Sequence, residues 1–169
     1  MVQTLKKGFT LVELLVVIAI IGVLTAVVTA QFSQAKAKSR DAKRVSDIAQ
    51  LQLIFEAYYD RCGEYPVFNG TERRVTLNST SLVTISNGCP AGVTLGSFIT
   101  RMPQPPSAGE VYTYVINPIP APTDYHLSAV LESTQSSAFN DDADFNSATW
   151  GTGGVNGVDS SRIYDVRPR

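Results

Sequence analysis

The fold of this 169-residue chain is decided by one stretch near its start, Gly8-Phe9-Thr10-Leu11-Val12-Glu13-Leu14-Leu15-Val16-Val17-Ile18-Ala19-Ile20-Ile21-Gly22-Val23-Leu24-Thr25-Ala26-Val27-Val28-Thr29-Ala30. A helix that spans a bilayer needs about 20 mostly apolar residues, and this stretch reaches that length. Glu13 is the single charged residue within residues 9–32, and no proline precedes Pro66 to break a helix. The sequence therefore predicts one membrane-spanning helix over residues 9–32.

Glu13 needs a partner, because a carboxylate in the middle of a membrane helix costs about 2.5–3.5 kcal/mol. A plain signal anchor provides none, and neither does a secretory signal peptide cleaved after Ala30, although small residues stand before that position. A cut between Gly8 and Phe9 would instead create an ammonium group one helical turn before Glu13. Two unit charges about 4 Å apart gain roughly 4 kcal/mol at an effective dielectric constant near 20. We therefore interpret Glu13 as the partner of the Phe9 amine of a neighbouring helix in an assembly.

Beyond residue 32 the pattern becomes amphipathic, with apolar residues at three- and four-residue steps from Val45 to Tyr58. This pattern favours a continuation of the same helix over residues 33–62, with one face packed on a globular head. Gly63 and Pro66 are typical of a helix end and its following turn.

Basic residues flank the apolar stretch on both sides. Lys6 and Lys7 precede it, so the positive-inside rule places that short end in the cytoplasm and the head outside the cytoplasm. The basic run from Lys36 to Arg44 fits either a solvated helix face near the membrane surface or contact with anionic lipid headgroups.

The head, residues 63–169, is rich in turn-forming residues and carries several short patterns of β-branched and aromatic residues. These patterns predict strands at residues 74–77, 111–116, 125–131 and near Ile163. The proline-rich segment 117–124 cannot extend a strand and is expected to connect two of them as a hairpin. The fold class expected is α+β, with a long N-terminal helix packed on a small antiparallel sheet.

Composition restricts the chemistry available to this chain. The formal net charge of −1 argues against a dedicated nucleic-acid-binding protein, which needs a basic excess. Cys62, Cys89 and the single histidine, His126, cannot complete a Cys/His zinc site without carboxylates. In an exported protein the two cysteines are expected to form one disulfide, and two buried free thiols are the alternative.

The string from Lys6 to Leu24 resembles the N-terminal methylation motif of type IV pilins and type II secretion pseudopilins. The resemblance implies that residues 1–8 are a leader, cut after Gly8 by a membrane aspartyl prepilin peptidase, and that Phe9 is then N-methylated. It also implies that Glu13 is the acid used in subunit docking. The partners implied are further copies of the same subunit, minor pilins, and an inner-membrane assembly platform with its ATPase.

One acidic cluster, Asn140-Asp141-Asp142-Ala143-Asp144-Phe145-Asn146, could bind a cation. Its alternating oxygen-bearing residues look like the opening of a calcium loop, but Ser147 and Gly153 stand where an EF-hand needs glycine and glutamate. An EF-hand is therefore excluded. The resemblance to major pseudopilins implies calcium at Asp141, Asp142 and Asp144, and a solvated acidic loop is the alternative.

No catalytic motif accompanies these features. His126 lies in a strand-like segment without a nucleophile placed beside it by a motif, and we interpret it as a structural histidine. The sequence thus predicts a non-enzymatic filament subunit that waits in the membrane before assembly, and it does not separate pilus, secretion pseudopilus and DNA-uptake fibre. The alternative is a secreted binding domain released after Ala30.

Overall fold

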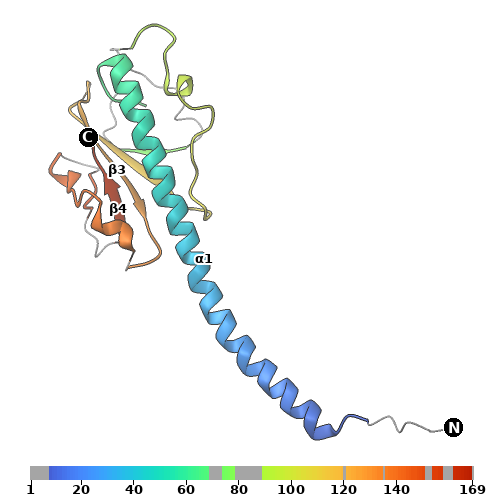
Figure 1. Cartoon of the computed structure of the whole chain (residues 1–169). Helices are drawn as coiled ribbons and strands as arrows, with labels where there is room; N and C mark the ends of the chain where they lie inside the picture. The colour runs from blue at the N-terminus through green and yellow to red at the C-terminus, as the bar shows by residue number, and fades with distance from the viewer. Residues whose placement is uncertain are drawn as a thin grey trace. The chain divides into compact units, whose positions relative to one another are not determined.

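The computed structural model describes residues 8–68, 74–78, 89–119, 121–134, 136–150, 154–157 and 162–168, apart from the side chain of Ala30. It contains one long helix, α1 (Leu11–Cys62), and one four-stranded sheet (Figure 1). The chain forms two compact units, residues 1–37 and residues 38–169. Each unit is described by itself.

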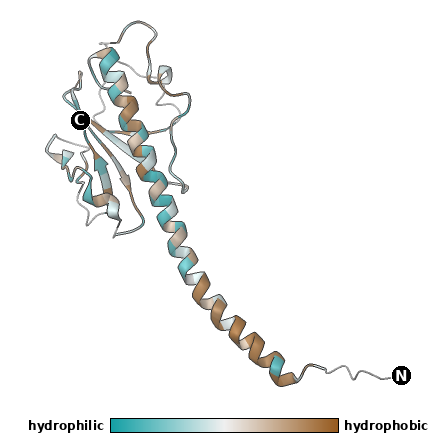
Figure 2. Ribbon diagram, in the orientation of Figure 1, coloured by the Kyte–Doolittle hydropathy of each residue, from teal (hydrophilic) through white to brown (hydrophobic). Residues whose placement is uncertain are grey.

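The first unit contains the apolar part of α1 (Figure 2). Its large apolar side chains are exposed along the whole stretch from Phe9 to Phe32. Among the described residues, this is one helix long and apolar enough to cross a membrane, by length and composition. The hydroxyl groups of Thr25 and Thr29 donate hydrogen bonds to helix carbonyls one turn earlier, so neither hydroxyl depends on water.

The helix begins two residues after the expected start at residue 9, because Thr10 acts as its N-cap, and it ends at Cys62 as expected. Gly63 follows with φ +73, the left-handed conformation that commonly ends helices.

In the second unit, four antiparallel strands form a sheet in sequential order. The strands are β1 (Arg74–Leu77), β2 (Tyr112–Asn117), β3 (Asp124–Val130) and β4 (Ile163–Val166), and the sheet order is β1-β2-β3-β4. The predicted α+β class and all four strand positions are confirmed, with shifts of one residue at some ends. Three short 3-10 helices, η2 (Leu95–Ser97), η3 (Ser137–Asn140) and η4 (Ser147–Trp150), were not predicted.

The core lies between the helix and one face of the sheet. Ile48, Leu51, Phe55 and Tyr58, which recur at helical spacing, are fully buried, as the amphipathic pattern predicts. They pack in one hydrophobic cluster with alternating residues of the strands, among them Tyr112, Tyr114, Ile116, Tyr125, Leu127 and Ala129. The rings of Phe55 and Tyr114 lie 4.7 Å apart, and such aromatic pairs add stability beyond the area that they bury.

The other face of the sheet carries the alternate residues and is covered in part by the chain after β3. Thr113 and Ser128 are opposite each other in the β2–β3 register, and Val130 is opposite Ile163 in the β3–β4 register. The loop 141–157, in which residues 151–153 lie outside the described part, reaches this face through Ser147, whose Oγ lies 2.8 Å from His126 Nδ1. The Ala143 N–H of the same loop donates to the carbonyl of Asp165 at 3.0 Å.

Candidate functional site

The candidate assembly site is the segment Gly8–Glu13 at the start of α1. Gly8, Phe9 and Thr10 precede the helix, and the Phe9 side chain is 84% exposed. Glu13 lies in the first helical turn. The structure therefore places a glycine–aromatic junction in non-helical chain directly before a helix whose first turn carries one acid.

Thr10 and Glu13 form a reciprocal cap that the sequence interpretation did not include. The Glu13 carboxylate accepts hydrogen bonds from the Thr10 N–H at 2.8 Å and from the Thr10 hydroxyl at 2.7 Å. The Glu13 N–H in turn donates to Thr10 Oγ1 at 3.2 Å. This is a capping box, and its signature of threonine followed three residues later by glutamate is visible in the sequence.

The cap changes the energetic argument for Glu13. Before assembly the carboxylate already has hydrogen-bond donors, and it lies at the positive end of the helix dipole. The donors from Thr10 are neutral, however, so the formal charge of Glu13 has no opposite charge among the described residues. The capped carboxylate remains able to bind an ammonium group.

The disulfide joins Cys62, the last residue of α1, to Cys89. Cys62 is buried, and the two cysteines are 27 positions apart in the chain. The bond therefore attaches the end of the helix to the segment that leads into η2, as expected from the two cysteines of an exported protein.

Replacing both cysteines by serine is expected to lower the free energy of unfolding by about 3.5 kcal/mol, because the unfolded chain regains the entropy that loop closure removes. Urea unfolding of the oxidised full chain in detergent, followed by circular dichroism, measures this difference. Reduction of the wild-type protein should give the same loss, and an unchanged midpoint in both experiments would contradict the prediction.

A buried arginine joins α1 to the head. The Arg44 side chain is 1% exposed and forms ion pairs with Asp41 at 2.6 Å, Glu110 at 2.6 Å and Glu132 at 2.8 Å. Arg40 lies one turn earlier and also pairs with Glu132. Three residues of the helix and two of the head loops thus share one ionic cluster.

The cluster also satisfies backbone groups of the head. The Asp41 carboxylate accepts hydrogen bonds from the N–H groups of Glu132 and Ser133, at 2.8 and 2.9 Å. Hydrogen bonds from Arg40 and Arg44 lower the pKa of Glu132 to about 2. Burial opposes the charge of Arg44, but its hydrogen bonds with Glu110 and Glu132 outweigh that effect and raise the pKa of Arg44, so Arg44 and Glu132 stay charged at neutral pH.

A second buried polar group forms a Ser–His–Asp chain. His126 Nδ1 lies 2.8 Å from Ser147 Oγ, and His126 Nε2 lies 2.7 Å from Asp165 Oδ2. The Val155 N–H donates to Ser147 Oγ, and the Phe145 N–H donates to Asp165 Oδ2. All three side chains are fully buried, so no substrate can reach the serine, and the group ties loop 141–157 to β3 and β4. His126 therefore has the structural contacts predicted, with partners that no sequence motif indicated.

The predicted calcium residues do not gather into a ligand set. Asp141 and Asp144 are exposed, and Asp142 is half-buried. Among the described residues, no group of three or more histidine, cysteine, aspartate or glutamate side chains could hold a metal ion. The acidic loop alone therefore does not supply a calcium shell, and calcium binding there stays a prediction.

The comparisons with known proteins concern mainly the N-terminal part of the chain. Residues 4–29 match the family model described as the prokaryotic N-terminal methylation motif. The chain is 39% identical over 54 residues to the type IV major fimbrial protein FimA of Dichelobacter nodosus, which covers 32% of this chain and 35% of that protein. It is 41% identical over 64 residues to the type II secretion system core protein G of Escherichia coli K12, covering 38% and 44% of the two chains.

A third relative matches over a longer stretch. The chain is 35% identical over 77 residues to a fimbrial protein of Neisseria meningitidis serogroup B, covering 46% of this chain and 45% of that protein. The chain thus spans less than half the length of these curated relatives. No solved structure matches. Together, the methylation motif, the fimbrial and type II secretion relatives and the α+β arrangement support a type IV pilin or pseudopilin.

Proposed function

We propose that this chain is the structural subunit of a type IV pilus-like or type II secretion filament that assembles through its N-terminal helix after cleavage behind Gly8. The observation that carries the proposal is the surface of residues 9–32. Eighteen large apolar side chains are exposed in the described part of the chain, and fifteen of them lie between Phe9 and Phe32. Such a surface needs lipid before assembly and other helices after it.

The proposed docking contact joins the Phe9 amine of one subunit to the Glu13 carboxylate of its neighbour. Cleavage after Gly8 leaves Thr10 in place, so the capping box can hold the carboxylate ready at the start of the helix. N-methylation of Phe9 would keep the positive charge. The prepilin peptidase, minor pilins, the assembly platform and its ATPase are the partners that this scheme requires.

The location that follows is a single-pass protein of the cytoplasmic membrane with its head outside the cytoplasm, and later a periplasmic or extracellular filament. Release after Ala30 is the less favoured alternative. It would cut the chain inside α1, which runs without interruption from Leu11 to Cys62. The head would lose none of its core in that case, but the assembly site Gly8–Glu13 and the apolar stretch that follows it would have no role in the mature protein.

Mass spectrometry of the mature protein from membranes or sheared filaments tests the processing step. We expect a chain that begins at Phe9 and carries one methyl group at its N-terminus. A Gly8→Val variant should keep its leader and remain in the membrane, since the cut site is altered. A mature wild-type chain that begins at Gln31, or assembled material with an uncut leader, would contradict the proposal.

A further inference from the structure

The head carries opposite charges at opposite edges of its sheet. Arg74 is the first residue of the edge strand β1, and it is exposed. Asp144 lies in the loop beside β4, the other edge strand, where the neighbouring Ala143 N–H donates to the carbonyl of Asp165. Asp144 is also exposed, and it has a positive φ of 46°.

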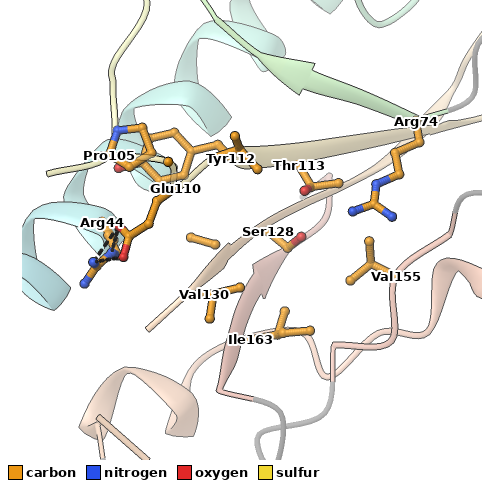
Figure 3. A pocket seen from close by; sticks show the side chains of 13 residues that line it. Arg44, Arg74, Pro105, Glu110, Tyr112, Thr113, Ser128, Val130, Val155 and Ile163 are labelled. Atoms are coloured by element: carbon orange, nitrogen blue, oxygen red, sulfur yellow. Dashed lines mark hydrogen bonds and ion pairs between the residues drawn. The ribbon is translucent and has the colours of Figure 1, made fainter. Parts of the chain in front are cut away.

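Arg74 lies at the rim of a cleft on the sheet face that α1 does not cover. The cleft has a volume of about 340 Å³, and its lining includes Arg74, Thr113, Ser128, Val130, Val155 and Ile163. Figure 3 shows Arg74 at one end of the cleft, with Arg44 and Glu110 at the other. The latter two form an ion pair, and no carboxylate of the described residues pairs with Arg74. The cleft is therefore apolar with one uncompensated positive charge.

Of the two exposed aspartates in the acidic loop, Asp141 and Asp144, Asp144 is the better electrostatic partner for Arg74. Asp141 lines a separate groove beside α1, together with Lys38, so a positive group of the same chain lies near it. No ion pair or hydrogen bond of the Asp144 side chain is found within the described residues. An unpaired carboxylate on an exposed loop can enter a neighbour's cleft without first breaking a contact.

Placement at opposite edges decides the symmetry of any contact between copies. A contact between Arg74 of one copy and Asp144 of another uses two different surfaces, so it is heterologous. A heterologous contact builds an open helical filament when the rotation between successive copies does not close into a ring.

From this geometry we propose that Asp144 of one copy enters the cleft of the next copy and pairs with Arg74. The occupant of the cleft is thus a second copy of this chain, and the inference deepens the filament function proposed above. An exposed ion pair contributes little by itself, but the apolar walls reduce screening around Arg74, and the contact recurs at every subunit. The pair chiefly selects the register between heads, because like charges placed there repel.

A charge swap in the full chain tests the pair. We expect Arg74→Glu and Asp144→Arg each to lower the yield of sheared filaments at least tenfold, and the double variant to recover to within about threefold of wild type. Arg101→Glu is the matched control, because Arg101 is exposed but does not line the cleft, and it should leave the yield unchanged. Single variants that assemble like wild type, or a double variant that does no better than the singles, would overturn the pair.

Crosslinking separates this inference from the filament proposal. Cysteines placed beside the pair keep both of its charges, because Thr76 and Ala143 are exposed and lie two residues and one residue from Arg74 and Asp144. In detergent-solubilised full chain, Thr76→Cys combined with Ala143→Cys should give a ladder of oligomers with a short bis-maleimide, whereas either single variant should not. A ladder without filaments would support the contact and count against the filament. Filaments of the double-cysteine protein without any ladder would overturn the contact and leave the filament function standing.

Discussion

Glu13→Leu is expected to abolish filament assembly while leaving the protein inserted in the membrane. Removing the carboxylate improves the apolar character of residues 9–32, so insertion does not suffer. Assembly loses the pairing with the Phe9 amine, and roughly 4 kcal/mol for each contact corresponds to nearly three decades in an association constant. Sheared filaments should therefore fall below detection, with the chain recovered in the membrane fraction.

Glu13→Gln distinguishes charge from capping. Glutamine can fill the third position of a capping box, so it retains the contacts with Thr10 without the negative charge. If the charge pairs with the Phe9 amine, Glu13→Gln should fail to assemble as Glu13→Leu does. Assembly of the Gln variant at wild-type yield would show that Glu13 acts only as a helix cap.

Arg44→Met is expected to destabilise the head by about 3–5 kcal/mol, because it leaves buried or half-buried carboxylates without their shared cation. Asp41 has a side chain only 5% exposed and loses its one charged partner, although its backbone donors from Glu132 and Ser133 remain. Urea unfolding of the full chain in detergent, followed by Trp150 fluorescence and circular dichroism, measures the loss.

Arg40→Met is the matched control for Arg44→Met. Arg40 is on the same helix and pairs with the same Glu132, but its side chain is 36% exposed. Exposed pairs contribute about 0–1 kcal/mol, so the control should lose less than 1 kcal/mol. Equal losses in the two variants would mean that burial of Arg44 does not govern the strength of the cluster.

Much of this architecture could be predicted from the sequence because its signals are local. An uninterrupted apolar stretch predicts a membrane helix whatever follows it, and the spacing of Ile48, Leu51 and Phe55 predicts which helix face is buried. The strands at residues 111–116 and 125–131 could be predicted because β-branched and aromatic residues there are flanked by turn-forming residues. The methylation motif is likewise a contiguous string, so the resemblance to type IV pilins and pseudopilins could be seen in residues 6–24.

The contacts between distant segments were decided only by the tertiary structure. Arg44 reads as one charge in a basic helical run, but it is buried because Glu110 and Glu132 converge on it from loops 66 and 88 positions later. His126, Ser147 and Asp165 carry no motif, since each comes from a different element and only the packing of loop 141–157 on β3 and β4 brings them together. Local sequence patterns thus determined which helices and strands form. The attachment of the helix and of loop 141–157 to the sheet was determined by complementary charges and buried hydrogen bonds, because these depend on the positions of residues in space.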